Sequence, residues 1–298
     1  MKQKRYNMLI ISMLLLIISA CGSGQKQESN TTNPKDDILR FNLDKPAKKI
    51  KLPAELREIS ALSYYKDNLV ACLQDEDGII YLIDFDTEEI AQKIKIAGKG
   101  DFEGIETIGD TAYMMKSKGK IIRIKNFMEE SPEIEKYDLG FGAKNDCEGL
   151  GFNAETNELL IACKGRAELP DDIQKNIKLP ELKKYRAVYT VNRKNMKLNI
   201  KPKYLLEKTE YEKISRTDDF KPSAIAVQPK TNNLYILASA GKLLVVIDKY
   251  GNYLTHKQLN PKQFIQPEGI CFSPDGKKLF IANEGKGGKG TILIFESF

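Results

Sequence analysis

One stretch of the chain decides the fold: residues 145–162, which read NDCEGLGFNAETNELLIA. From its fourth residue it contains an acidic residue, a glycine and an apolar residue, and an Asn-containing turn separates two runs of apolar residues. Apolar residues in alternation are typical of a β-strand, and asparagine tolerates the positive φ that tight turns require. The stretch therefore predicts a β-hairpin that begins at Glu148.

The same pattern recurs along the chain. Its acidic position is occupied by Glu58, Glu103, Glu148 and Glu268, and a further copy has Ser223 in its place. The spacing is 45 residues from Glu58 to Glu103, 45 to Glu148, 75 to Ser223 and 45 to Glu268. A period of about 40–50 residues is the length of one propeller blade. The chain is therefore predicted to be an all-β, five-bladed β-propeller.

The long interval leaves one alternative open. It contains residues 165–184 and 207–219, and a degenerate blade formed there would make six blades. Outer strands are predicted at 91–96 and 253–258, the second of which contains His256. Residues 38–57 are predicted to supply the outer strand of the last blade and to close the ring.

The N-terminus has the features of a secretory signal. Lys2, Lys4 and Arg5 precede an apolar run over residues 8–20, and Cys21 follows small residues. The end of the run resembles the bacterial lipobox, so residues 1–21 are predicted to be a lipoprotein signal with Cys21 as the lipidated residue. A plain signal peptide is the alternative.

Three segments follow from this prediction: the signal over 1–21, a flexible tether over 22–37, and the propeller over 38–298. We expect export and attachment to a membrane through the lipid. Gly22 after the cysteine favours a periplasm-facing outer membrane if the cell is Gram-negative. The formal net charge falls from +6 to +3 without the signal, and its interspersed charges argue against a nucleic-acid partner.

Four cysteines remain in the predicted mature chain: Cys72, Cys147, Cys163 and Cys271. Cys147 and Cys163 are predicted to face each other across a hairpin, where an oxidising compartment permits a disulfide. The interpretation that we favour treats all four as small buried apolar residues. Their spacings match no paired-cysteine metal site.

The recurring glutamates point to a site on the propeller axis. The first strand of each blade lines the central channel, so Glu58, Glu103, Glu148 and Glu268 are predicted to meet near one mouth. Crowded carboxylates repel, so some must be protonated, paired with Lys or Arg, or bound to a cation. Alternatively, each glutamate accepts hydrogen bonds from the neighbouring blade and only holds the ring together.

Calcium is the cation that we expect, with Mg²⁺ as the alternative, because Ca²⁺ takes about 6–8 hard oxygen ligands. Further ligands at the same rim are predicted to be Asp146, Ser223, Asn283 and Glu284. Segment 74–78 resembles a metal loop, but Asp-Gly before a strand favours a hairpin turn.

Several segments together resemble the SdiA-regulated (YjiK-like) family, and the resemblance runs from about residue 40 to the C-terminus. They are residues 58–60, 74–81, 101–106, 145–150, 221–225 and 266–270. The resemblance implies a five-bladed propeller, distantly similar to NHL-repeat proteins, with a calcium site. The lipobox is a departure from members that have a different N-terminus.

The sequence thus predicts a lipid-anchored, cation-binding propeller that acts as a ligand-binding module for a small molecule, a glycan or a protein. A metal-dependent hydrolase of phosphoesters or lactones is the alternative, since such an enzyme needs only acidic ligands and a bound water. A protein-interaction scaffold without metal is a third. The catalytic residues of a hydrolase are not identified, because no Gly-x-Ser-x-Gly motif is present.

Overall fold

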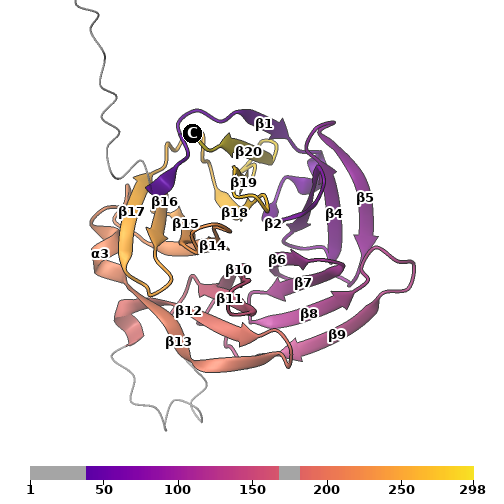
Figure 1. Ribbon diagram of the computed structural model, residues 1–298, viewed down its shortest axis with the longest axis horizontal. Coiled ribbons are helices and arrows are strands. Elements are labelled where there is room, and N and C mark those ends of the chain that lie inside the picture. Colours follow the sequence, from indigo (N-terminus) through magenta and orange to yellow (C-terminus); the bar gives the residue numbers. More distant parts are fainter. Residues whose placement is uncertain (1–37, 168–181) are drawn as a thin grey trace, which may run out of the picture. The chain divides into compact units, whose positions relative to one another are not determined.

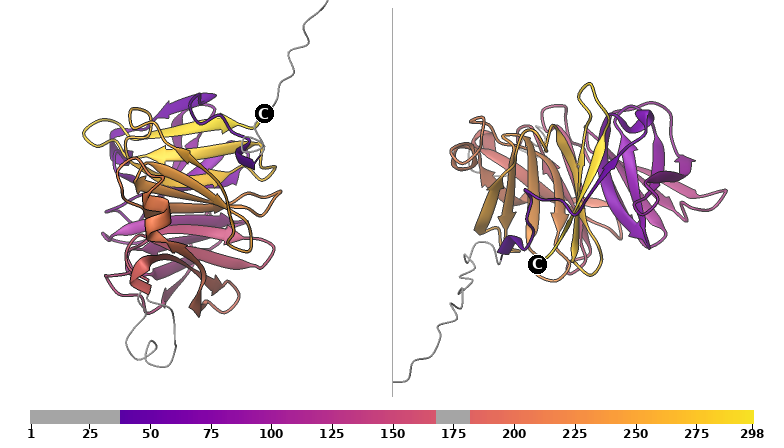
Figure 2. Two further views of the ribbon diagram at one scale, coloured as in Figure 1. Left: turned by 90° about the vertical axis from the view of Figure 1, so that its left-hand side faces the viewer. Right: turned by 90° about the horizontal axis from the view of Figure 1, so that it is seen from above.

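A computed structural model describes residues 38–167 and 182–298 of the chain. These residues form five four-stranded antiparallel sheets arranged around a central axis (Figure 1). Seen from the side, the strands run between the two faces of the ring (Figure 2). The five-bladed propeller predicted from the repeat is confirmed.

Each blade starts with the strand nearest the axis and continues outward in chain order. The first blade contains β2 (Ile59–Lys66), β3 (Leu69–Gln74), β4 (Ile79–Asp84) and β5 (Glu89–Lys95). The second contains β6 (Phe102–Ile108), β7 (Thr111–Lys116), β8 (Lys120–Lys125) and β9 (Glu133–Asp138). The third contains β10 (Cys147–Asn153), β11 (Glu158–Cys163), β12 (Tyr185–Asn192) and β13 (Lys197–Glu207).

The last two blades follow the same order. The fourth contains β14 (Lys221–Val227), β15 (Leu234–Ala240), β16 (Leu243–Ile247) and β17 (Tyr253–Gln258). The fifth contains β18 (Pro267–Phe272), β19 (Lys278–Asn283) and β20 (Thr291–Glu296), with β1 (Lys48–Lys51) as its outer strand. His256 lies in the outer strand β17, as predicted.

The long interval between the third and fourth copies adds little regular structure. Residues 207–219 contain the short helix α3 (Lys208–Glu212), and the 3-10 turn η2 (Leu182–Lys184) precedes β12. A second 3-10 turn, η1 (Ala54–Leu56), lies between β1 and β2. The described part of the interval therefore adds a connection between two blades, and not a sixth sheet.

The N-terminal strand closes the ring. β1 pairs antiparallel with β20, so the fifth sheet contains strands from both ends of the described chain (Figure 1). Ile50 and Leu52 are fully buried in an apolar cluster with Phe280 and Ile292. The closing role predicted for residues 38–57 is confirmed.

Apolar clusters fill the space between successive sheets. Each of five clusters takes its side chains from two neighbouring blades. Between the second and third blades, for example, Ile121 and Tyr113 pack in one cluster with Leu159 and Tyr189. Because each face of a sheet is covered by the next sheet, the middle strands β3, β7, β11, β15 and β19 are almost wholly buried.

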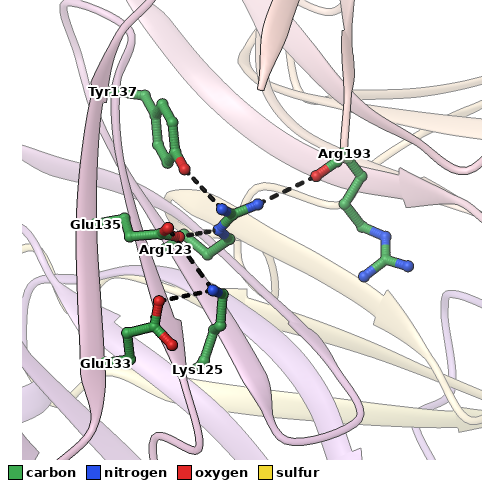
Figure 3. Close-up of polar contacts among 6 residues, drawn as sticks. All are labelled: Arg123, Lys125, Glu133, Glu135, Tyr137 and Arg193. Carbon is green, nitrogen blue, oxygen red and sulfur yellow. Dashed lines mark hydrogen bonds and ion pairs between the residues drawn. The ribbon is translucent and has the colours of Figure 1, made fainter. Parts of the chain in front are cut away.

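A polar network reinforces the contact between the second and third blades at their outer edge (Figure 3). The Arg123 guanidinium on β8 pairs with Glu135 on β9 and donates a 2.6 Å bond to the Tyr137 hydroxyl. Its Nη1 also donates to the Arg193 carbonyl of the next blade, at 3.4 Å. Lys125 pairs with Glu133 at 2.7 Å.

The four cysteines of the propeller are buried free thiols. Cys147 and Cys163 are directly opposite each other on β10 and β11, with their sulfur atoms 4.0 Å apart. Both the predicted facing geometry and the burial are therefore confirmed. The predicted signal, lipidated Cys21 and tether lie outside the described residues. Within the described residues, no helix has the length and hydrophobicity needed to cross a membrane.

Shortening the buried side chain of the closing strand is expected to destabilise the whole ring. Ile50→Ala leaves a cavity between β1 and the fifth and first blades, which should lower the free energy of unfolding by about 2–4 kcal/mol. Lys51→Ala, on the exposed side of the same strand, should change it by less than about 0.5 kcal/mol. Urea unfolding followed by circular dichroism measures both, and equal effects would contradict closure by β1.

Candidate functional site

Every innermost strand contains a β-bulge at the same position. In β10, Cys147 pairs with Cys163 but Gly149 already pairs with Ala162, so Glu148 is an extra residue without a partner. A bulge of this kind redirects the side chain of the extra residue, and bulges are frequent beside functional sites. The five residues at these positions, which we call the bulge ring, are Ser60, Glu103, Glu148, Ser223 and Glu268.

Glu58 was predicted to be the ring residue of the first blade, and this prediction was wrong by two residues. Ile59 pairs with Gln74 and Ala61 with Leu73, so Ser60 is the bulged residue of the first blade. Glu58 is exposed and precedes β2. Glu58 precedes Glu103 by the same 45 residues that separate Glu103 from Glu148, which is why it was predicted as the equivalent residue. The residue that is structurally equivalent, Ser60, precedes Glu103 by 43 residues.

The glycine that follows three of the bulges has a steric cause. A Cβ added at Gly149 would lie 3.0 Å from the backbone of Ala224 and Ile225 in the next blade. A Cβ at Gly269 would lie 2.9 Å from the Leu62 backbone nitrogen. The innermost strands thus approach so closely that the position after the bulge accepts only a very small residue, which explains the Glu-Gly pair in the repeat.

A second ring of polar residues lies at the end of the second strand of each blade, directly after the strand in four blades and at its next-to-last residue in the fourth. Lys164 donates its backbone N–H to the Asp146 carbonyl at 2.8 Å, beside the bulge at Glu148. Glu284 makes the equivalent 2.8 Å bond to the Gln266 carbonyl, beside Glu268. The residues at this position, here called the second ring, are Asp75, Ser117, Lys164, Ser239 and Glu284. Both rings therefore lie at one mouth of the channel.

The three bulge-ring carboxyls have raised pKa values, and electrostatic repulsion within the ring contributes to the pKa of Glu103 and of Glu148. Burial, followed by repulsion from Glu148, raises the pKa of Glu103 to about 10. Burial and repulsion from Glu268 raise the pKa of Glu148 to about 8, although Lys164 opposes the change. The Lys164 ammonium is 2.8 Å from Glu148, which is only 5% exposed. Structure thus brings Glu103, Glu148 and Glu268 together, as the repeat predicted.

The remaining acidic residues extend the negative field across the mouth. Burial raises the pKa of Glu268 to about 7, against the opposing influence of Lys164. Burial also raises the pKa of Glu284, with further contributions from Asp75 and Glu58. Asp75 has a raised pKa from burial and then from Glu58. Glu58 consequently influences the site from beside the ring and not from the predicted position within it.

Several buried polar atoms at this mouth have no hydrogen-bond partner within the protein. They are the Ser60 hydroxyl, one carboxyl oxygen of Asp75, and both amide atoms of Asn283. Asn283 is 2% exposed, and its Cα partner is Pro267, the residue before Glu268. Buried polar atoms are normally paired, so unpaired ones beside crowded carboxyls indicate a site for a polar ligand or an ion.

The other predicted ligands lie in different surroundings. The Ser223 hydroxyl donates a 2.8 Å bond to the Pro267 carbonyl and joins the fourth blade to the fifth. Asp146 has a positive φ of 51° and lines a neighbouring cavity. Across residues 38–167 and 182–298, no three His, Cys, Asp or Glu side chains are grouped so that they could hold a metal ion. An ion would require the carboxylates to turn toward one another.

Sequence reasoning missed Ser60, Asp75 and Lys164. Segment 74–78 is the hairpin turn that was favoured, since the Gln74 side chain accepts the N–H groups of Glu76 and Asp77. Asp75 nevertheless belongs to the second ring. A signal for this ring existed, because each member lies at the end of a buried apolar strand within a repeat of known frame.

The raised pKa values predict how stability depends on pH when divalent cations are removed by EDTA. A carboxyl with a raised folded pKa binds more protons in the folded state, so stability falls as pH rises from about 4.5 toward the folded values of about 7, 8 and 10. Glu103→Gln keeps that position neutral and should raise the free energy of unfolding at pH 8 by at least about 1 kcal/mol. Urea unfolding across this pH range measures the effect.

Glu89→Gln, at an exposed position on the outer strand β5, is the matched control and should leave the pH profile unchanged. A profile that is flat for the unmodified protein, or equally altered by both substitutions, would contradict the electrostatic crowding of the bulge ring.

Among known proteins, solved structures share the fold with this chain. Glutaminyl cyclase from Myxococcus xanthus is similar with a TM-score of 0.55 at 10% identity, over 85% of this chain and 97% of that one. A luciferin-regenerating enzyme is similar with a TM-score of 0.50 at 11% identity, over 85% and 96% of the two chains. At these identities the likeness concerns the fold alone.

No curated protein sequence matches the chain. The sequence profile described as SdiA-regulated matches residues 39–286, which is nearly the whole propeller. The chain therefore belongs to the SdiA-regulated family.

Proposed function

We propose that this propeller binds a divalent cation, Ca²⁺ in preference to Mg²⁺, at the channel mouth formed by the bulge ring and the second ring. One observation supports the proposal above all. Glu148 is buried and Glu103 and Glu268 are partly buried at the same mouth, where Glu148 and Glu268 oppose the ionisation of Glu103, and Glu268 opposes that of Glu148. A divalent cation would stabilise all three in the ionised form.

The donor set has the chemistry that Ca²⁺ prefers. Hard oxygens come from the three glutamates, with Asp75, Ser60 and Asn283 supplying buried polar atoms that lack partners in the protein. Calcium accepts irregular sets of about 6–8 oxygens, whereas Mg²⁺ requires near-ideal octahedral geometry. Histidine, a common ligand of zinc, occurs once in the chain, and that residue lies in the outer strand β17.

Binding would require Glu148 to change partners. Its carboxylate accepts a 2.8 Å hydrogen bond from Lys164, and the lysine would have to turn away as the cation is bound. The ion would then join the innermost strands of the second, third and fifth blades. With the ion exposed toward the open face, the mouth would serve as a binding surface for an anionic or oxygen-rich ligand.

The proposal includes attachment to the cell envelope. Cys21 stands at the end of an apolar segment in a lipobox-like context, and residues 22–37 connect it to the propeller. A lipid on Cys21 would hold the propeller at a membrane surface, exported from the cytoplasm. The module would then act on ligands outside the cytoplasm.

Calcium binding is tested by isothermal titration of the detergent-solubilised full chain after removal of metals. We expect Ca²⁺ to bind more tightly than Mg²⁺ and to raise the temperature of unfolding, because only the folded state assembles the site. Glu148→Gln together with Glu268→Gln should weaken Ca²⁺ binding at least about a hundredfold, since two charged ligands are lost.

Glu89→Gln together with Glu133→Gln removes the same number of charges from exposed positions on β5 and β9 and should leave Ca²⁺ affinity within twofold. Absence of Ca²⁺ binding, with an unfolding temperature that is the same in EDTA and in Ca²⁺, would overturn the proposal.

Lipidation is tested by expressing the full chain in a bacterial host supplied with radiolabelled palmitate. The unmodified chain should incorporate label and sediment with membranes, because a diacylated cysteine anchors a protein stably. Cys21→Ser should abolish both. Cys72→Ser, a buried thiol of the propeller, is the control and should leave labelling intact. Label retained by Cys21→Ser would contradict the anchor.

A further inference from the structure

A cavity of about 190 Å³ lies on the propeller axis, at the end of the channel opposite the bulge ring. Its lining comes from the innermost strands of all five blades and the turns that follow them. Ser63, Glu106, Phe152, Val227 and Phe272 represent the five blades in turn, and each lies in the second half of its strand. The bulge ring lies in the first half of the same strands, so the two features occupy opposite ends of one channel.

Glu106 is the one charged side chain among the described residues that line this cavity. It follows Glu103 by three residues on β6, a separation of about 10 Å along the strand. Most of the lining is apolar, and Tyr64, Phe152 and Phe272 contribute three aromatic rings. A carboxyl in such surroundings is costly to ionise, and burial raises the pKa of Glu106 to about 8.

The protein supplies Glu106 with a weak partner. Its Oε1 accepts a hydrogen bond from the Ser63 hydroxyl at 3.4 Å, which is long for a bond between two oxygens. The same hydroxyl lies 3.2 Å from Thr107 Oγ1, which donates its own proton to the Tyr64 carbonyl at 2.8 Å. Ser63 therefore divides one proton between two acceptors. In the described chain, the Ser63 hydroxyl opposes the rise in the pKa of Glu106, and no ammonium or guanidinium group contributes.

The other titratable groups in the lining stay neutral at the pH where Glu106 ionises. Burial raises the pKa of the Tyr64 hydroxyl on β2, and burial together with Glu106 raises the pKa of the Cys271 thiol on β18. The lining residues from β10 and β14 carry no titratable side chain. Arg193 lies over the Phe152 ring at 5.7 Å but does not line the cavity. An ionised Glu106 would thus be a single negative charge enclosed by uncharged walls.

We infer that this cavity binds a small organic ammonium ion through the Glu106 carboxylate and the aromatic walls. The charge of such an ion pairs with the carboxylate, while its carbon groups contact the apolar lining, and aromatic rings attract ammonium groups. The volume suits a compact ion, because sites for drug-sized ligands measure about 300–1,000 Å³. A metal ion is poorly suited, since one carboxylate and one shared hydroxyl do not supply the roughly six or more oxygens that Ca²⁺ takes.

The test uses tetramethylammonium as the probe, titrated calorimetrically into the detergent-solubilised full chain in EDTA at a pH of about 9, where Glu106 is ionised. The comparison ligand is tert-butanol, which is uncharged and has nearly the same shape. Tetramethylammonium should bind to one site at least about tenfold more tightly than tert-butanol, because only the cation pairs with the carboxylate. No binding of tetramethylammonium, or equal binding of the two molecules, would overturn the inference.

The affinity for tetramethylammonium should rise with pH up to about 8 and then level off, since below that pH Glu106 must lose a proton before the cation binds. The probe keeps its charge at every pH, so the change reports the ionisation of a group on the protein. Glu148 ionises in the same range, and the variants below therefore assign the change to one residue. An affinity that does not vary with pH would contradict a site formed around Glu106.

Glu106→Gln keeps the size of the side chain but removes its charge, so it should weaken tetramethylammonium binding at least about tenfold and abolish the dependence on pH. Glu106→Asp keeps a carboxylate and should bind the probe more tightly than Glu106→Gln does. Glu133→Gln, at an exposed position on β9 of the same blade, is the matched control and should bind within about twofold of the unmodified chain. Equal losses in the two glutamine variants would show an effect of net charge and overturn the inference.

This inference and the proposed cation site fail separately. Glu106→Gln should bind Ca²⁺ as the unmodified chain does, because Glu106 belongs to neither ring at the opposite mouth, and this binding also shows that the variant is folded. Conversely, the Glu148 and Glu268 variant should still bind tetramethylammonium in EDTA, with the same dependence on pH. Loss of tetramethylammonium binding in that variant would place the probe at the bulge ring and overturn the assignment to Glu106.

Discussion

The close backbone approach of five innermost strands around one axis is the constraint on which the rest of this structure depends. A Cβ atom would lie 3.0 Å from the backbone of the next strand at Gly149 and 2.9 Å from it at Gly269, so little space remains there. Because these strands pack so tightly, their ends also lie close together at the mouth of the channel. Each strand has a bulge there, and the bulged side chain, three times a glutamate, is directed into a space that its counterparts share.

The fold can maintain the crowded carboxyls at the mouth because its stability comes from the apolar packing between the blades. Two like charges several ångströms apart near a protein surface repel by about 2–4 kcal/mol. Five apolar clusters between the blades bury many large side chains, each worth about 1.5–3 kcal/mol. The gain from packing thus exceeds the repulsion, and the protein can hold carboxyls whose pKa values are raised. Uncharged residues at the same positions would be more stable, and this cost in stability is why we propose that the ring serves binding.

The repeat was sufficient to predict the blades, the closing strand and three of the glutamates, because strand alternation and a fixed period follow directly from the sequence. It failed at Glu58, where a connection shorter by two residues placed Ser60 at the bulge. The period of the repeat gives only the number of residues between copies, whereas the location of a bulge depends on how two strands pair. Lys164 and Asp75 were missed for a related reason, since their importance arises from charged residues that are distant in sequence, above all Glu148 for Lys164 and Glu58 for Asp75.

Lys164 balances part of the negative charge at the mouth when no cation is bound. Its ammonium lies 2.8 Å from the Glu148 carboxylate and opposes the rise in the pKa of Glu148 that burial and Glu268 cause. A cation bound as we propose would replace the lysine as the partner of Glu148. Displacing the lysine costs free energy, which the cation would recover by contacting Glu103 and Glu268 as well. Because binding free energies are linked, any interaction that holds Lys164 away from Glu148 would raise the affinity for the cation, and the cation would favour that position of the lysine to the same extent.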